Sequence, residues 1–340
     1  MYCDRKRDGN NMEYADLIWD NDEIERKKFI DNLAPIVLFT YNRLKHTKQT
    51  IEALLDNIYA EHSRLYIYSD GPKNEESVEK VQEVRDYLHT IAGFKEIVIV
   101  EREKNWGLAE NIIDGVTEIV NEYGKIIVLE DDIVTSKYFL KYMNDALEIY
   151  KDEPKVMEIS GYMYPLKDNK DLPETWFVHR FADCWGWATW ARSWQYFERN
   201  PQKLIEEFSK KDIMAFNFDG NYDFWKQIEA NAEGNLYTWA VFWQATVFKQ
   251  DGYMLAVSNS MTRNAGFDKT GEHCGKSDSF NVPLAIDPVM HFPVIVKEKA
   301  IFRDRLTVGM VNSGGGVGLL RRLLKKIEQL LRSRRIIEEK

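Results

Sequence analysis

The sequence predicts an α/β fold with a mostly parallel central sheet flanked by helices. Apolar runs of strand length alternate with amphipathic segments in the first half of the chain. The runs are continuous rather than alternating in polarity, which is typical of strands buried on both faces. Each segment of helical spacing follows a strand directly, as in a chain of strand–helix–strand units. These three observations together favour a layered, mostly parallel sheet.

Four strands and three helices are expected, in alternation. The expected strands are PIVLFTYNR at 35–43, RLYIYSDGP at 64–72, KEIVIVERE at 95–103 and KIIVLEDD at 125–132. The second of them is stopped by Asp-Gly-Pro, a strong turn signal. The helices between them lie within 46–59, 75–91 and 105–124.

Beyond residue 150 the alternation fades. One more strand is expected within 153–165, helices within 200–230, and a helix or strand at 238–252. We divide the chain into an extension at 1–33, a first half at 34–150, a second half at 151–312, and a linker with a basic helix at 313–340. The second half is rich in aromatic residues, and five tryptophans lie between Trp176 and Trp194. At least three of these five are expected in the core, with Trp185 and Trp187 nearest to a site.

The composition limits which binding partners and which cellular compartment we expect for the protein. A net charge of −9 argues against nucleic acid, because a surface that follows phosphates is normally basic. Three widely spaced cysteines suggest no disulfide framework, which favours a reducing cytosol. The N-terminal residues have no apolar segment typical of a secretory signal, and no apolar run is long enough to cross a membrane.

Polar side chains follow three of the four expected strands, where each strand ends. Parallel strands bring such residues to one edge of the sheet, where ligands of this fold class bind. The residues are Asn42 and Arg43, Ser69 and Asp70, and Glu130, Asp131 and Asp132.

The three consecutive acids need a positive partner, and carboxylate oxygens suit Mg²⁺ or Mn²⁺. A simpler interpretation is that these acids cap the helix expected to follow them and favour its N-terminal dipole. Asp70 is placed to accept an N–H of a nucleobase, and Arg43 to reach a phosphate or the base. The stretch from Asn105 to Asn111 opens a helix with a small residue, which lets its amides approach a phosphate or ribose.

With these motifs in order, residues 34–280 resemble the GT-A-fold glycosyltransferases. The similarity is greatest to the inverting N-acetylglucosaminyltransferase I type and to related bacterial sugar transferases of polysaccharide gene clusters. The stretches that carry it are PIVLFTYNR, IYSDG, IIVLEDDIVTSKYFLKYM, CWGWATW and SMTRNAGFDKTGEHCG. The resemblance implies a GT-A (Rossmann-like) fold in which the last acid of Glu-Asp-Asp binds the metal.

The resemblance also assigns roles to individual residues. It implies a Mn²⁺ or Mg²⁺ ion near Asp132 and His273. It implies contacts with the nucleotide-sugar from Arg43, Asp70, Asn105, Asn111, Glu130, Asp131 and Trp187.

One departure from the family pattern concerns the base that deprotonates the acceptor. The family has an Asp in a Trp-Asp-Asp-Trp-like segment, whereas Trp239–Trp243 here contains no carboxylate. An attacking alcohol must still lose a proton. The acids left for this role are Asp183, Asp219, Asp223 and Glu272; we favour Asp223, with Glu272 as the second candidate.

The function implied is metal-dependent transfer of a hexosyl or N-acetylhexosaminyl group from a UDP-sugar to a glycan, with inversion, in surface polysaccharide synthesis. Two alternatives remain at this stage. A sugar nucleotidyltransferase also places acids at strand ends, but no Gly-rich basic loop follows the first strand. A non-catalytic carbohydrate-binding or scaffold protein of the same fold would explain the missing base.

The C-terminal segment 319–335 has apolar residues on one helical face and seven basic residues around the rest. This pattern predicts an interfacial helix on an anionic membrane surface. A helix docked on the protein itself, or on another subunit, is the alternative. With membrane contact, we expect a cytoplasmic protein, peripheral on the inner face of the cell membrane and acting on a lipid-linked glycan.

Overall fold

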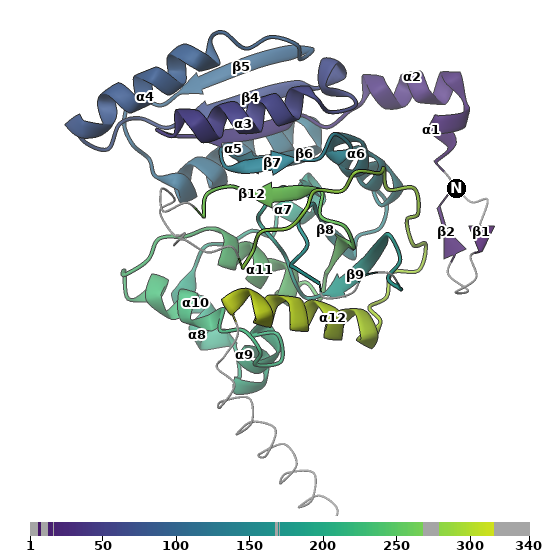
Figure 1. Cartoon of the computed structure of the whole chain (residues 1–340). Coiled ribbons are helices and arrows are strands. Elements are labelled where there is room, and N and C mark those ends of the chain that lie inside the picture. Colours follow the sequence, from purple (N-terminus) through teal and green to yellow (C-terminus); the bar gives the residue numbers. More distant parts are fainter. Residues whose placement is uncertain are drawn as a thin grey trace, which may run out of the picture.

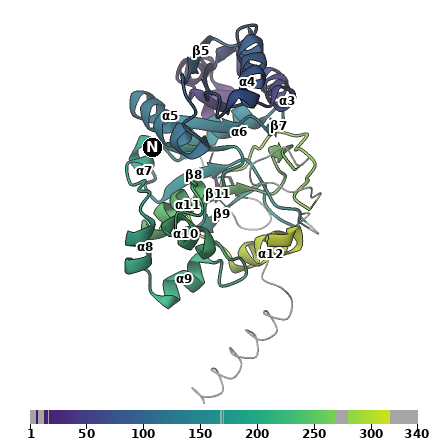
Figure 2. The same cartoon turned by 90° about the vertical axis from the view of Figure 1, so that its left-hand side faces the viewer.

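A computed structural model describes residues 6–7, 13–15, 17–166, 169, 171–267 and 279–315 of the 340-residue chain. Two predicted site residues, Glu272 and His273, lie outside these described residues, as does the basic segment 319–335. Figures 1 and 2 show the arrangement of the elements in two views related by 90°.

The centre of the fold is an eight-stranded sheet in the order β5-β4-β3-β6-β10-β8-β11-β9. Its strands are β3 (Ile36–Thr40), β4 (Arg64–Ser69), β5 (Glu96–Glu101), β6 (Lys125–Glu130), β8 (Val156–Ser160), β9 (Thr175–His179), β10 (Trp187–Trp190) and β11 (Tyr253–Val257). The pairs β5–β4, β4–β3, β3–β6 and β8–β11 are parallel, whereas β10 runs antiparallel to β6 and β8, and β9 to β11. The predicted mostly parallel α/β sheet is confirmed.

Helices cover both faces of this sheet (Figure 1). Alternate residues of β3 belong to two different cores, because successive side chains in a strand point to opposite faces. Ile36 and Leu38 pack in the core shared with α3, α4 and α6, while Val37 and Phe39 pack in the core shared with α5 and α11. The continuous apolar runs of the sequence therefore reflect burial from both sides.

The remaining elements are short strands and the helices themselves. The helices are α1 (Ile18–Asn21), α2 (Glu23–Asp31), α3 (Leu44–Leu55), α4 (Glu75–Leu88), α5 (Leu108–Tyr123), α6 (Phe139–Ile149), α7 (Ala191–Trp194), α8 (Pro201–Glu207), α9 (Lys210–Phe216), α10 (Trp225–Ala232), α11 (Ala240–Lys249) and α12 (Ala300–Met310). A 3-10 turn spans Ala60–His62, and a π-turn spans Val311–Gly315. The short strands are β1 (Lys6–Arg7), β2 (Glu13–Tyr14), β7 (Ile133–Thr135) and β12 (Thr262–Asn264).

The acidic run is followed by a short strand, β7, which pairs with β12, and not directly by a helix. Asp131 and Asp132 enter β7 directly, and Ile133 pairs antiparallel with Asn264. Helix α6 begins only at Phe139, and its N-cap residue makes no side-chain capping bond. The acids therefore do not cap the following helix, so that simpler interpretation is wrong.

The tryptophan-rich region forms part of the core. Trp187 packs against the rings of Trp194, Trp239 and Trp243, with centroid distances of 5.9, 5.3 and 5.8 Å. Of the five tryptophans between 176 and 194, all except Trp185 are buried. The expectation that at least three are core residues agrees with this arrangement.

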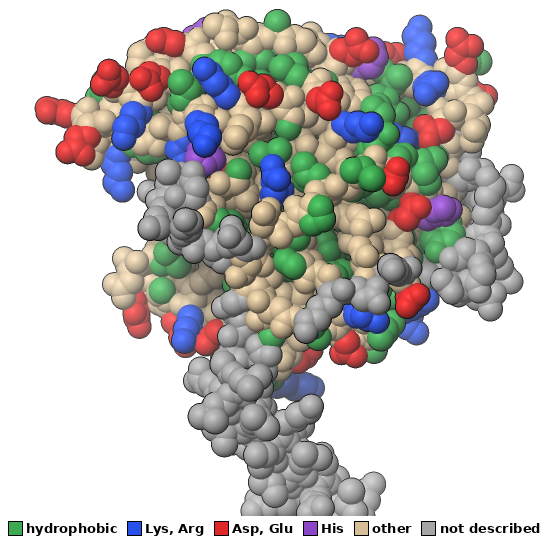
Figure 3. Space-filling model, viewed as in Figure 1, with side chains coloured by type: hydrophobic (Ala, Val, Ile, Leu, Met, Phe, Trp, Pro, Cys, Tyr) green, Lys and Arg blue, Asp and Glu red, His purple; other side chains and the backbone are tan. Residues whose placement is uncertain are grey.

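The side of the molecule shown in Figure 3 is not dominated by charge of one sign. On the side shown in Figure 3, acidic and basic side chains are interspersed, with separate hydrophobic side chains between them. Among the described residues, no helix combines the length and the apolar character needed to cross a membrane.

A buried ionic network ties the N-terminal helices to α6. Trp19 Nε1 donates to Asp145 Oδ1 at 3.0 Å, and Lys141 Nζ donates to Asp145 Oδ2 at 2.9 Å. Lys141 also binds the partly exposed Asp20 at 2.9 Å. Burial raises the pKa of Asp145 to about 7, and the Lys141 ammonium opposes this rise.

We expect Asp145→Ala to lower the free energy of unfolding by about 3 kcal/mol, because Lys141 and the Trp19 indole lose a fully buried partner. Asp20→Ala is the matched control and should cost about 1 kcal/mol or less, since Asp20 is partly solvated. Urea unfolding at a pH above 7, where Asp145 is ionised, measures both. Equal losses in the two variants would contradict this account of the network.

Candidate functional site

A cleft of about 1280 Å³ opens at the carboxyl ends of β3, β4 and β6. One wall comes from the first half of the chain, where parallel strands bring the loops after each strand together. The opposite wall comes from scattered segments of the second half. Lining residues of this second wall include Tyr164, Cys184, Trp185, Tyr222, Tyr237, Thr238, Trp239, Phe267 and Phe280.

The two walls touch at one edge of the cleft. Tyr237, in the loop between α10 and α11, donates its hydroxyl hydrogen to Glu110 of α5. The Tyr237 ring also lies 3.5 Å from the Arg199 guanidinium carbon. A segment that is remote in sequence thereby closes the cleft beside the start of α5.

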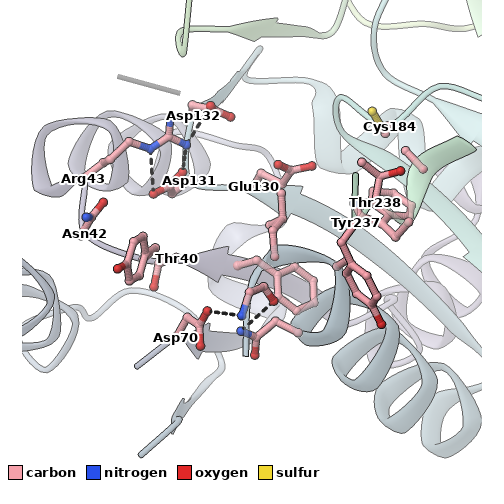
Figure 4. Close-up of a pocket in the computed structure, with 18 of the residues that line it drawn as sticks. Thr40, Asn42, Arg43, Asp70, Glu130, Asp131, Asp132, Cys184, Tyr237 and Thr238 are labelled. Atoms are coloured by element: carbon pink, nitrogen blue, oxygen red, sulfur yellow. Dashed lines mark hydrogen bonds and ion pairs between the residues drawn. The ribbon is translucent and has the colours of Figure 1, made fainter. Parts of the chain in front are cut away.

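The positive partner of the acidic run is Arg43. Its Nη2 donates to Asp131 and, at 2.8 Å, to Asp132 Oδ2, as the dashed lines in Figure 4 show. β3 and β6 pair in parallel with Phe39 opposite Glu130, so the residues that follow both strands reach the same edge. Both aspartates are buried, and Arg43 offsets part of their desolvation.

One arginine does not neutralise three acids. Burial raises the pKa of Glu130 to about 8, and the neighbouring Asp132 and Asp131 charges add to this effect. Burial also raises the pKa of Asp131 to about 6, although Arg43 opposes it. Burial lowers the pKa of Arg43, but the two carboxylates outweigh this and hold it above its ordinary value. Further positive charge, such as a cation, would therefore stabilise the ionised carboxylates of this site.

Glu130 is arranged differently from the two aspartates. In Figure 4 its carboxylate points away from the Arg43 guanidinium, which contacts only Asp131 and Asp132. Glu130 lines the cleft. Burial raises the pKa of Cys184 on the opposite wall, and the charge of Glu130 adds to this rise. Its carboxylate is thus directed into the space between the walls.

The Asp70 side chain holds the neighbouring loop in place by hydrogen bonds. Its two oxygens accept from the backbone N–H groups of Gly71, Trp106 and Gly107 at 2.8, 2.8 and 2.9 Å. They also accept from Asn105 Nδ2 at 2.9 Å. Since an ionised carboxylate has about four acceptor positions, these four donors use its capacity. A base N–H would have to displace one of them.

Asn105 lines the cleft beside Asp70. Its amide hydrogens go to Asp70 and to the carbonyl of Gly71, which is 2.9 Å away. The Asn105 Oδ1 atom is then the polar atom of this loop that suits a ligand N–H. Asn111 lies deeper: it is buried and accepts from Arg102 Nε at 3.1 Å. Arg102 in turn stacks on the exposed Trp106 ring at 3.9 Å.

Two predicted site residues lie away from the cleft. Trp187 is in the tryptophan core, and its neighbour Trp185 lines the cleft instead. Asp223 does not line the cleft; it accepts from Asn217 Nδ2 at 3.3 Å and pairs with Lys226 at 3.4 Å. The structure therefore brings together Arg43, Asp70, Asn105, Asn111, Glu130, Asp131 and Asp132, but neither Trp187 nor Asp223.

The chemistry of Asp131 and Asp132 fits a hard divalent cation, although the described residues include no group of three His, Cys, Asp or Glu ligands. Such an ion needs only one or two protein carboxylates when water and a diphosphate complete its shell. Gly266 leaves the space open, because a Cβ at this position would collide with Asp132 Oδ2.

Sequence reasoning missed the residues of the second wall that approach the cleft by tertiary folding, such as Tyr164, Tyr222 and Phe280. No motif marks them, since they lie in segments without regular periodicity. The aromatic content of the second half was the one signal of their presence.

We expect Asp70→Ala to lower the free energy of unfolding by about 3 kcal/mol, because it leaves several backbone N–H groups without their acceptor. Hydrogen exchange should rise at Trp106 and Gly107. Asp86→Ala, in an exposed position of α4, is the control and should stay within about 0.5 kcal/mol. If Asp70 served only to contact a base, stability would be unchanged and only nucleotide binding would weaken.

Comparison with solved structures gives distant similarities. TarS of S. aureus has 12% sequence identity and a TM-score of 0.38, over 68% of this chain and 36% of TarS. The mannosyltransferase PcManGT from Pyrobaculum calidifontis, solved with GDP-Man and Mn²⁺, has 11% identity and a TM-score of 0.33, over 53% of this chain and 52% of that enzyme. The chain thus corresponds to about a third of the first protein and half of the second.

None of the curated proteins compared with the chain matches it in sequence. Residues 36–221, more than half of the chain, match the sequence profile of Glycosyl transferase family 2. The matched region contains β3 to β6, the acidic run and the tryptophan-rich segment. The chain belongs to glycosyl transferase family 2 and has a GT-A fold.

Proposed function

We propose that this glycosyltransferase moves a hexosyl or N-acetylhexosaminyl group from a UDP-sugar to a glycan acceptor, with inversion and with the help of a divalent metal. The observation that carries the proposal is the arrangement of Asp131 and Asp132 around Arg43, with Glu130 directed into the same cleft. Two aspartates share one arginine and a third acid points into the same cleft, so the site attracts a further cation.

The metal is Mn²⁺ or Mg²⁺, held by Asp132 with support from Asp131. When bound, such an ion neutralises charge on the departing nucleoside diphosphate. Arg43 is close enough to both carboxylates to exchange one of them for a phosphate oxygen of the donor. Support from His273 is retained as a proposal based on the sequence, since this residue lies outside the described part of the chain.

The nucleotide lies against the first wall. The Asp70-supported loop presents Asn105 Oδ1, which suits the N3–H of uracil. The backbone at Gly107 precedes α5, where N–H groups favour an anionic ligand. Glu130 is directed toward the sugar or ribose hydroxyls. These contacts favour a uridine nucleotide.

The acceptor lies against the second wall. Trp185, Tyr164 and Phe280 offer ring faces and polar edges of the kind that pack on sugar C–H groups and bind hydroxyls. We propose a glycan or lipid-linked glycan of a surface polysaccharide as acceptor. The basic segment 319–335 would hold the enzyme at the anionic inner face of the membrane.

The central test is incubation of the full chain with a panel of UDP-sugars and Mn²⁺, measured as UDP release. We expect release that chelation abolishes, and a loss of about 100-fold or more in Asp132→Asn, because an interaction with the metal is removed. Asp287→Asn changes an exposed acid that does not line the cleft; it is the matched control and should release UDP at the normal rate. Metal-independent release would contradict the metal proposal.

A second test uses stability instead of activity. Arg43→Met removes the cation that separates Asp131 from Asp132, so the thermal unfolding temperature should fall when no divalent ion is present. Added Mn²⁺ should then raise the unfolding temperature more in Arg43→Met than in the wild type, because the ion no longer competes with Arg43. An equal or smaller rise in the variant would show that the ion binds elsewhere.

One observation favours a second candidate, a carbohydrate-binding protein without catalysis. In the described part of the chain, every acid that lines the cleft comes from the first half: Asp70, Glu76, Glu130, Asp131 and Asp132. The second wall presents Thr238, Trp239 and Ala240 where the family pattern has a carboxylate. Binding of UDP-sugar without any UDP release would support this second candidate.

A further inference from the structure

An exposed tyrosine lies on the second wall, at the edge where the two walls meet. Tyr237 lines the cleft from the loop between α10 and α11, and 54% of it is exposed. In Figure 4 it lies with Thr238 on the side of the cleft opposite Arg43 and Asp131. Single exposed aromatic side chains are ordinary on protein surfaces, so exposure alone indicates no function. The contacts that hold Tyr237 distinguish it from such residues.

The side chain of Tyr237 is held at its ring and at its hydroxyl group. One ring face covers the guanidinium of Arg199, whose carbon lies 3.5 Å from the ring centroid. The hydroxyl donates to the Glu110 carboxylate on α5. Because Arg199 covers one face, the exposed surface of this ring belongs to its other face and its edges. The loop therefore presents an open aromatic face in a fixed orientation.

The backbone on both sides of Tyr237 is also held. The Leu236 N–H donates to the Ala230 carbonyl at 3.1 Å, and the Thr238 N–H donates to Asn231 Oδ1 at 3.1 Å. Arg199 Nε donates to the Thr238 carbonyl at 3.0 Å, and its Nη2 donates to Asn231 Oδ1 at 2.8 Å. A ligand that packs on the ring would thus meet a preorganised surface, which lowers the entropy cost of binding.

A separate aromatic surface lines the same cleft. The rings of Trp185, Phe267 and Phe280 contact one another, with centroid distances between 5.0 and 5.6 Å. Tyr237 takes part in none of the ring–ring contacts in the part of the chain that the structure describes. The cleft volume of about 1280 Å³ exceeds the roughly 300–1,000 Å³ of a site for one small ligand. The cleft therefore has room for a donor and for sugar rings on both aromatic surfaces.

The surroundings of the Tyr237 ring suit a sugar. A pyranose has C–H groups on its faces, which pack on an aromatic ring, and hydroxyl groups around its edge. An ionised carboxylate has about four acceptor positions, so Glu110 can accept from a sugar hydroxyl while it holds Tyr237. Asn235, in the same loop, also lines the cleft and adds a polar side chain beside the ring.

We propose that Tyr237 forms a second sugar-binding subsite, separate from the surface of Trp185 and Phe280, and that it binds a further sugar ring of the acceptor. The protein would then recognise an acceptor of at least two sugar residues, one on each aromatic surface. This inference rests on the function proposed above, because it takes the acceptor to be a glycan.

The test compares sugars of different length on the full-length protein in the presence of UDP and Mn²⁺. The probes are methyl glycosides of the common hexoses and N-acetylhexosamines and the corresponding disaccharides, and their affinities are measured by saturation-transfer NMR. We expect at least one disaccharide to bind the wild type about fivefold more tightly than its monosaccharide. Tyr237→Ala should remove this difference, because the second ring loses its surface.

Two further variants separate the ring face from other effects. Tyr237→Phe should keep most of the disaccharide preference, because the ring can still cover Arg199 and only the bond to Glu110 is lost. Tyr196→Ala is the matched control: Tyr196 is 51% exposed but does not line the cleft, so the preference should stay at the wild-type value. Thermal unfolding of each variant shows that it is folded.

Several outcomes overturn the inference. They are a wild type that binds no disaccharide more tightly than its monosaccharide, and an undiminished preference in Tyr237→Ala. A loss in Tyr237→Phe equal to that in Tyr237→Ala would assign the effect to the hydroxyl bond with Glu110 instead of the ring face. A loss of UDP affinity without a loss of disaccharide preference in Tyr237→Ala would place the donor on this ring.

Failure of the proposed function has a different signature. A wild type that releases no UDP from any UDP-sugar would contradict the transferase proposal, whatever the sugars show. A disaccharide preference that depends on Tyr237 would then identify the subsite in a carbohydrate-binding protein without catalysis.

Discussion

The contact on which the site depends is the one between the Arg43 guanidinium and the paired carboxylates of Asp131 and Asp132. Two buried aspartates in sequence would repel each other strongly without a cation between them. Arg43 reaches them only because β3 and β6 are adjacent and in parallel register. The charge balance of the cleft therefore depends on the order of strands in the sheet.

The two walls of the cleft are built in different ways. The first uses successive strand–loop–helix units, so residues near in sequence meet at one sheet edge. Asp70 is the local hub there, because its carboxylate collects donors from the loop that begins α5. The second wall joins segments between Tyr164 and Phe280, and it depends on the tryptophan core and on Glu158 behind it. The two walls are thus supported by separate packing units.

The tryptophan-rich segment illustrates where sequence reasoning fails. Trp185 and Trp187 are two residues apart, and both were expected at the site. Gly186 between them has φ of +82° and makes a close crossing with Gly161, whose N–H donates to the Gly186 carbonyl at 2.8 Å. This turn lies just before β10 and sends one indole to the cleft and the other to the core. Asp223, which does not line the cleft, follows a turn with positive φ at Phe218, Asp219 and Gly220.

The sequence by itself determined the strands, the helices between them and the acidic run, because these follow from local periodicity and from where each apolar run ends. It therefore also predicted that Arg43, Asp70 and Asp132 meet at one edge, since parallel strands require this. Only the tertiary structure decided which partner each group has: Arg43 with the aspartates, and Asp70 with the loop before α5. It also brought Tyr164, Trp185 and Phe280 together on the opposite wall, because a contact between distant segments depends on packing that no local pattern encodes.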